Sequence, residues 1–249
     1  MDMTDQKIDL SIVIPTYNER KNISILVPQV IELFNGLGLT FEILVVDDSS
    51  PDGTQEAVKR LQIDFPNNQI RLINRQKKEG IGAALKEGYD RSLGKYILSS
   101  DADLSFPVED MKTLYDKITS GYDLVVGSRY SPGGRYERKN ARTLSKGMVS
   151  IVGNRLFSSL FNLPVSDFSA NFRIIKNDTW KEIKTKENTN FLLFEMIFKT
   201  CLKSAKVTEI PVSFIDRKYG QSKLNLSIEA PKAAGKLFVY LLKYKFKLL

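Results

Sequence analysis

Two aspartates one residue apart, Asp101 and Asp103, follow a short apolar stretch at residues 94–98 that is typical of a buried strand. Residues i and i+2 of an extended chain point to the same side, so both carboxylates can face one spot where the strand ends. Two close carboxylates repel each other unless a cation lies between them, and oxygen ligands suit a hard divalent ion such as Mg²⁺. The pair therefore indicates either a divalent-metal site or two loop-capping aspartates.

The composition excludes several kinds of catalytic site. The 249 residues contain no histidine and one cysteine, Cys201. Serine or cysteine nucleophiles activated by histidine, zinc sites built from histidine or several cysteines, and intramolecular disulfides are therefore excluded. Chemistry in this chain must depend on carboxylates and basic groups, with or without a bound metal.

The net charge of +8 predicts an anionic partner, either a phosphorylated small molecule, an anionic membrane surface or nucleic acid. Nucleic acid is the weakest of these, because no helix-turn-helix, zinc-finger or RNP pattern is present. The first residues lack the layout of a signal peptide, and no apolar run reaches the ~18 residues of a membrane span. We therefore expect a protein that faces the cytoplasm.

Apolar strands and amphipathic helices alternate through the first hundred residues. Strands are expected at 10–15, 41–46, 70–73 and 95–99, with helices at 22–34, 55–61 and 80–91 between them. This alternation predicts a single α/β domain with a doubly wound, mostly parallel sheet and helices on both faces. Polar clusters follow the strands at residues 15–19, 47–54, 77–82 and 101–105. Because ligands of such sheets bind beyond the carboxyl ends of the strands, these clusters predict a binding cleft.

The second half is less regular. Helices are expected at 108–119, 144–163, 191–201 and 231–249, strands at 124–127 and 207–214, a loop at 166–173 and a turn at 180–183. The helix at 144–163 could be a core helix or lie on a membrane. The last helix mixes lysines with apolar residues, which suits either packing on the domain or an anionic membrane interface. We expect a catalytic domain at 1–225 and a basic amphipathic helix at 226–249.

Seven motifs, in order, resemble those of family-2 glycosyltransferases of the GT-A fold, and within that family the dolichol-phosphate mannose synthases. The resemblance extends from about Leu10 to Leu224. The motifs are Pro-Thr-Tyr-Asn-Glu (15–19), Asp-Asp-Ser-Ser-Pro-Asp-Gly-Thr (47–54), Gly-Ile-Gly (80–82), Asp-Ala-Asp-Leu-Ser-Phe-Pro (101–107), Gly-Ser-Arg-Tyr (127–130), Ser-Lys-Gly (145–147), and Arg217 with Gly-Gln-Ser-Lys (220–223).

The resemblance implies metal-dependent transfer of mannose from GDP-mannose to a polyisoprenyl phosphate, with Mg²⁺ or Mn²⁺ as cofactor. It implies catalytic roles for Asp101, Asp103, Arg129 and Arg217 and a metal site at Asp101, Asp103 and Ser105. The acceptor phosphate would be held by Arg129, Arg142 and Ser145. The donor would be bound by Pro15, Tyr17, Glu19, Asp47, Asp48, Gly80, Asp101, Ala102, Asp103, Arg217 and Lys223. A phosphate acceptor is already deprotonated near neutral pH, its second pKa being about 6, so we expect direct attack without a general base.

Several residues depart from the usual pattern of these synthases. Ser105 lies where a Gln is common, and residues 167–173 (Asp-Phe-Ser-Ala-Asn-Phe-Arg) replace a usual Asp-x-Thr-Ser-Gly-Phe-Arg. The second change leaves acceptor and sugar selectivity open. Arg142 is our choice for a further family arginine, with Arg138 as the alternative. Many relatives carry carboxyl-terminal membrane spans that this chain lacks.

Three rival functions follow from the same residues. The first is a glycosyltransferase that uses UDP-glucose or another UDP-sugar. The second is an inactive partner subunit that binds nucleotide sugar. The third, a dinucleotide oxidoreductase, is disfavoured because Gly-Ile-Gly at 80–82 lacks the third glycine. The expected partners are a nucleotide-diphosphate sugar, a polyisoprenyl phosphate and a membrane surface bound peripherally at its cytoplasmic face. The need for a small accessory membrane protein is left open.

Overall fold

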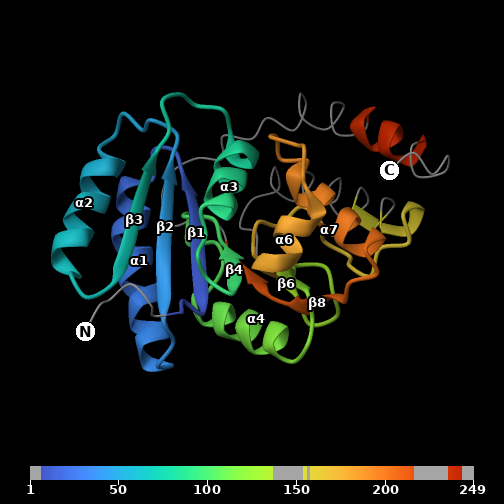
Figure 1. Ribbon diagram of the computed structural model, residues 1–249, viewed down its shortest axis with the longest axis horizontal. Helices are drawn as coiled ribbons and strands as arrows, with labels where there is room; N and C mark the ends of the chain where they lie inside the picture. The colour runs from blue at the N-terminus through green and yellow to red at the C-terminus, as the bar shows by residue number, and fades with distance from the viewer. Residues whose placement is uncertain (1–6, 137–153, 156–157, 216–234, 243–249) are drawn as a thin grey trace.

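The computed structural model describes residues 7–136, 154–155, 158–215 and 235–242. In Figure 1 α1, α2 and the strands β1 to β3, in blue and cyan, lie on the left, and α6, α7 and the helix at 235–242 lie on the right. The main element is a seven-stranded sheet with the order β3-β2-β1-β4-β7-β5-β8. Its strands are β1 (Leu10–Thr16), β2 (Phe41–Asp47), β3 (Gln69–Asn74), β4 (Tyr96–Ser99), β5 (Leu124–Ser128), β7 (Arg173–Lys176) and β8 (Val207–Pro211).

All neighbouring strands are parallel except β7, which is antiparallel to both β4 and β5. A second, two-stranded sheet pairs β6 (Arg135–Tyr136) with β9 (Ser213–Phe214). This arrangement confirms the predicted mostly parallel α/β sheet. The carboxyl ends of β1, β2, β4 and β5 therefore share one edge, and the loop that precedes β7 reaches the same edge because β7 runs in the opposite direction.

Helices cover both faces of the sheet. They are α1 (Arg20–Gly36), α2 (Thr54–Asp64), α3 (Ile81–Asp90), α4 (Glu109–Thr119), α6 (Asn177–Ile183) and α7 (Leu192–Leu202). Alternate residues of the central strands enter opposite cores, as the two-residue period of a strand requires. Ile12 and Ile14 of β1 pack with α1, α2 and α4, whereas Val13 packs with α3, α6 and α7.

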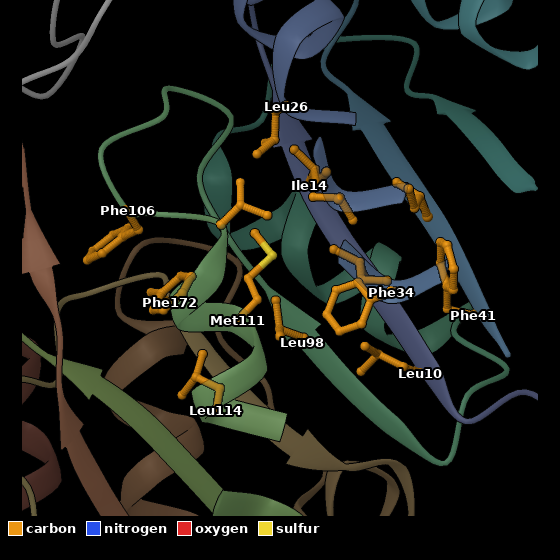
Figure 2. Packing of buried hydrophobic residues seen from close by; sticks show 14 of the residues in the cluster. Leu10, Ile14, Leu26, Phe34, Phe41, Leu98, Phe106, Met111, Leu114 and Phe172 are labelled. Atoms are coloured by element: carbon orange, nitrogen blue, oxygen red, sulfur yellow. The ribbon is translucent and has the colours of Figure 1, made fainter. Parts of the chain in front are cut away.

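Figure 2 shows the first of these cores from close by. Phe34 of α1 contacts Phe41 at the start of β2, with ring centroids 5.7 Å apart. Phe106 stacks on Phe172 at 4.6 Å, so the segment after the Asp101–Asp103 pair packs against the residue that precedes β7. Aromatic pairs in this geometry contribute about 0.5–1.5 kcal/mol beyond the area they bury. The core therefore helps to fix both loops at the carboxyl edge.

The structure corrects three expectations from the sequence. Strand β7 begins at Arg173, the last residue of the expected loop, and continues through residues 174–176, for which no element was expected. The expected turn at 180–183 is the end of helix α6, and the expected strand at 207–214 is divided into β8 and β9. The division arises because β9 leaves the main sheet to pair with β6.

The two expected helices of uncertain position are described only in part. Residues 154–155 and 158–160 are helical, as are 235–242. Residues 161–163 are described and are not helical, so the first of the two predicted helices ends three residues earlier than expected. The other residues of both predictions lie outside the described residues. Leu237 and Tyr240 are buried in a third cluster with Phe161, Phe191, Phe194 and Phe198. The helix at 235–242 therefore packs on α7. None of the helices in the described ranges is both long and apolar enough to cross a membrane.

Candidate active site

The predicted metal-binding pair follows β4 directly at the carboxyl edge. Asp103 is buried, and its Oδ1 accepts a hydrogen bond of 3.0 Å from the backbone N–H of Ser105. Leu104 between them has a φ of +60°, which turns the chain sharply. The Oδ1 of Asp101 accepts a bond of 3.0 Å from Nδ2 of Asn171. Asp103 is thus held by a local contact and Asp101 by a contact with a residue 70 positions away, both just beyond the end of β4.

Ser105 provides a test of whether these residues fit a divalent ion. Its hydroxyl is buried and has no hydrogen-bond partner among the described residues. Leaving a buried hydroxyl unsatisfied costs about 1–3 kcal/mol, so such groups normally meet water, an ion or a ligand. No group of three or more acidic or cysteine side chains within the described ranges could hold a metal alone. Two carboxylates, a hydroxyl and substrate oxygens form a donor set that suits Mg²⁺ or Mn²⁺.

The two aspartates that end β2 fix the neighbouring loops. Asp47 accepts hydrogen bonds from Thr16 (2.9 Å), from Ser50 and from Gln55 (2.9 Å). Asp48 forms a 2.5 Å ion pair with Arg75 and accepts the backbone N–H groups of Glu79 and Gly80. Both carboxylates therefore hold together the loops of the predicted donor-binding site through contacts within the protein.

Gly80 and Gly82 also have defined structural positions. Gly80 precedes α3 with a φ of +94°, a conformation that favours glycine. A Cβ on Gly82 would overlap the backbone carbonyl of Thr189, so the Gly-Ile-Gly motif allows the loop before α7 to approach the start of α3. The motif therefore has a packing function that sequence reasoning did not identify.

The remaining predicted donor residues surround the end of β1. Pro15 pairs with Val46 within the sheet, and the ammonium of Lys78 lies 3.9 Å from the Tyr17 ring centroid. Glu19 accepts a 2.6 Å bond from Asn22 at the start of α1. Ala102 is buried between the two aspartates. The structure thus brings the described donor residues to the same edge of the sheet.

Arg129 follows β5 and forms a two-point ion pair with Asp167. The Nε–Oδ2 and Nη2–Oδ1 distances are 2.7 and 3.0 Å, and Nη2 also donates to Ser169 at 2.8 Å. Burial alone would raise the pKa of Asp167 and lower that of Arg129, but their mutual attraction reverses both shifts. Both groups therefore stay charged near neutral pH, and Asp167 fixes the guanidinium plane.

Sequence reasoning missed Asp167, Asn171 and Arg173 as parts of this edge. Arg173 is fully buried and donates to the backbone carbonyls of Phe168, Ala170 and Leu193. Burial lowers its pKa to about 10. Its contacts hold the loop at 167–171 in place. The only signal in the sequence was the departure of this stretch from the usual pattern.

Four predicted site residues, Arg142, Ser145, Arg217 and Lys223, lie outside the described residues, as does the alternative Arg138. Two cavities of about 260 and 370 Å³ lie along α3, and neither is lined by Asp101, Asp103 or Arg129. These two cavities therefore do not belong to the predicted site.

Comparison with known proteins identifies the family. The model of glycosyl transferase family 2 matches residues 11–188, which is more than half of the chain. The chain belongs to this family of enzymes. Asp101, Asp103 and Arg129 all fall within the matched segment.

Two curated relatives are more specific. The chain is 34% identical over 226 residues to a dolichol-phosphate mannosyltransferase of Pyrococcus furiosus, covering 86% of this chain and 59% of that protein. It is 30% identical over 220 residues to a polyprenol monophosphomannose synthase of Mycolicibacterium smegmatis, covering 86% of this chain and 80% of that one. The chain thus spans about three fifths of the Pyrococcus protein.

Solved structures confirm the GT-A fold. A glucosyl-3-phosphoglycerate synthase from Mycobacterium tuberculosis, in complex with Mn²⁺ and UDP, has a TM-score of 0.67 at 14% identity, covering 95% of this chain and 79% of that one. A mannosyltransferase from Pyrobaculum calidifontis, in complex with GDP-Man and Mn²⁺, has a TM-score of 0.60 at 18% identity, covering 87% and 59%. At these identities the likeness concerns the fold.

Proposed function

We propose that this chain transfers mannose from GDP-mannose to a dolichyl or other polyprenyl phosphate. The observation that carries the proposal is the 30–34% identity to two synthases whose names specify mannose and a polyprenol or dolichol phosphate. The carboxylates at the carboxyl edge support it, because they can hold a divalent cation, and such a cation neutralises the charge of a diphosphate leaving group.

Donor binding is assigned to the edge between β1, β2 and β4. Asp101, Asp103 and the buried hydroxyl of Ser105 would hold Mg²⁺ or Mn²⁺. Mn²⁺ is the ion named in the complexes of two structural relatives. Such an ion neutralises charge on the departing diphosphate. The donor would lie against Pro15, Tyr17, Glu19, Asp47, Asp48, Gly80 and Ala102, with Arg217 and Lys223 closing over it.

The acceptor phosphate would be held in line by Arg129, together with Arg142 and Ser145. One acceptor oxygen forms a bond to the anomeric carbon while the bond from that carbon to the GDP oxygen breaks, and the electron pair leaves with GDP. The configuration at the anomeric carbon is therefore inverted. No proton has to move at the attacking atom, because the second pKa of a phosphate monoester is about 6. Asp167 keeps Arg129 charged and oriented for this contact.

An enzyme with a lipid acceptor must bind a membrane, and the helix at 235–242 has a surface suited to this. Leu237 and Tyr240 face α7, whereas Phe238, Val239 and Leu242 are exposed on the same helix, Phe238 by 61%. An apolar face flanked by lysines in the sequence suits peripheral binding to an anionic bilayer. We place the chain at the cytoplasmic face of a membrane on this basis.

The donor and acceptor are tested by offering radiolabelled GDP-mannose and UDP-glucose in parallel with short-chain dolichyl phosphate and Mn²⁺. We expect mannosyl lipid that disappears with EDTA. Glucosyl lipid alone would replace the proposed donor with a UDP-sugar and keep the acceptor. The absence of lipid product with either donor, despite nucleotide binding, would overturn the proposal and favour a non-catalytic partner subunit.

A further inference from the structure

A chain of hydrogen bonds between side chains ends at the first aspartate of the predicted metal pair. The Tyr89 hydroxyl donates to the Ser99 hydroxyl at 2.8 Å, and Ser99 donates to Oδ1 of Asn171 at 2.7 Å. Nδ2 of Asn171 then donates to Oδ1 of Asp101 at 3.0 Å. This series of hydrogen bonds starts in α3, passes the end of β4 and reaches the loop before β7, so it connects three separate elements.

The direction of these hydrogen bonds, from donor to acceptor, fixes which way the Asn171 amide points. An amide oxygen and nitrogen are interchangeable in shape, so their assignment depends on their partners. Burial raises the pKa of Tyr89 to about 12, which keeps its proton on the hydroxyl at physiological pH. The Ser99 oxygen accepts the hydrogen bond from Tyr89, so the Ser99 hydroxyl donates its own hydrogen to an acceptor, the amide oxygen of Asn171. The NH₂ group of Asn171 is left for Asp101.

Burial makes these bonds consequential. Ser99 and Asn171 are almost completely buried, and Tyr89 is 1% exposed. In such surroundings a hydrogen bond is stronger than in water and an unmet partner is costly. The register of β4 and β7 brings the ends together, because Ser99 pairs with Arg173 and the residues beyond each therefore lie side by side.

We propose that Asn171 is a positioning residue that orients the Asp101 carboxylate toward the metal-nucleotide site. The inference rests on the proposed metal site and deepens it. The family pattern that this chain resembles has glycine at this place, and glycine has no side chain to make the contact. The Asn171 bond is therefore a feature of this chain's own sequence. Partners that orient a ligating carboxylate typically affect metal affinity 10–100-fold.

The test is binding of Mn²⁺ in the presence of GDP, measured by electron paramagnetic resonance of the unbound ion, which needs no turnover. We expect Asn171→Ala to weaken Mn²⁺ binding about 10-fold. Asn177→Ala is the matched control, because Asn177 is also buried and donates to two backbone carbonyls, those of Ser92 and Gly94, away from the site. We expect it to lower the melting temperature without changing Mn²⁺ affinity.

A second variant covers the case in which Asn171→Ala does not fold. Ser99→Ala removes the donor that fixes the Asn171 amide and should weaken Mn²⁺ binding about 3-fold. Equal affinity in wild type and Asn171→Ala, or an equal loss in Asn177→Ala, would overturn the inference while leaving the metal site intact. If Asn171→Ala is unfolded, unchanged affinity in Ser99→Ala would overturn it. If the wild type itself fails to bind Mn²⁺ with GDP, the proposed metal site fails and the inference with it.

Discussion

Asp167 and Arg129 are joined by two hydrogen bonds of 2.7 and 3.0 Å, although they are 38 residues apart in the sequence. Asp167 is fully buried at the start of the loop that leads into β7, and Arg129 follows β5. The same loop supplies Asn171 to Asp101. One loop of five residues, 167–171, therefore contacts both the predicted metal-binding and the predicted acceptor-binding parts of the carboxyl edge.

The first prediction concerns the stability of this ion pair. Asp167→Asn should lower the free energy of unfolding by up to about 3–5 kcal/mol, because it removes the charge that a largely buried guanidinium, 12% exposed, contacts at two points. Arg129→Leu with Asp167→Leu should cost less than the sum of the single changes. Urea unfolding of wild type, Arg129→Leu, Asp167→Leu and the double leucine variant measures this coupling, and Asp167→Asn is measured beside them. Additive losses would mean that the pair does not act as a unit.

The second prediction is the pH dependence of the same interaction. The pKa of Asp167 is lower in the folded chain than in the unfolded one, so the unfolded state binds its proton first as the pH falls. The stabilisation is therefore present above the ordinary aspartate pKa of about 3.9 and is lost as the pH falls below it. We expect the stability difference between wild type and Asp167→Asn to be constant from pH 7 to 5 and to shrink below about pH 4. A constant difference at pH 3 would contradict the assignment.

The third prediction compares two helical glycines. Gly82→Ala should lower stability by about 1–3 kcal/mol or more, because the new Cβ would overlap the backbone of Thr189. Gly36→Ala at the end of α1 meets nothing within 4 Å and should be neutral or stabilise by up to about 1 kcal/mol. Thermal unfolding distinguishes the two. Tolerance of Gly82→Ala would show that the loop at 188–189 does not pack closely on α3.

The fourth prediction tests the membrane surface. Phe238→Asp should reduce binding to anionic vesicles about 10-fold or more, since burial of a phenylalanine side chain contributes roughly 1.5–3 kcal/mol. Ile63→Asp on α2 is the control, because Ile63 is exposed to a similar extent, 69% against 61% for Phe238, but lies on a different helix. Co-sedimentation with vesicles measures both. Equal loss in the two variants, or failure of the wild type to bind any vesicle, would refute the proposal that the helix at 235–242 binds the membrane.

The parallel part of the fold could be predicted because its strands are buried on both faces and alternate with amphipathic helices. Strands β1, β2 and β4 and the aspartates after them were found in this way. Strand β7 was missed because it begins with an arginine and inserts antiparallel between β4 and β5. It therefore does not belong to the strand–helix alternation of the parallel part, and its partners are distant in sequence.

The same omission explains which site residues were missed. Asp167 and Asn171 reach the carboxyl edge only because β7 runs against its neighbours, so no pattern in the loop itself indicates their position. Asp48 illustrates the converse. Its motif predicts a place at the carboxyl edge of the sheet, and the structure has Asp48 there, directly after β2. The ion pair with Arg75 that holds Asp48 in place could not be predicted from the motif.

The most direct test of the account is formation of mannosyl lipid from GDP-mannose and dolichyl phosphate by wild type, Asp103→Asn and Asp116→Asn. Asp103 is buried at the proposed metal site, whereas Asp116 is exposed on α4 and paired with Lys112. We predict a loss of about 100–1,000-fold in kcat for Asp103→Asn and a change of less than about twofold for Asp116→Asn. Wild-type rates in Asp103→Asn, with the fold intact, would contradict the assignment of catalysis to this edge of the sheet.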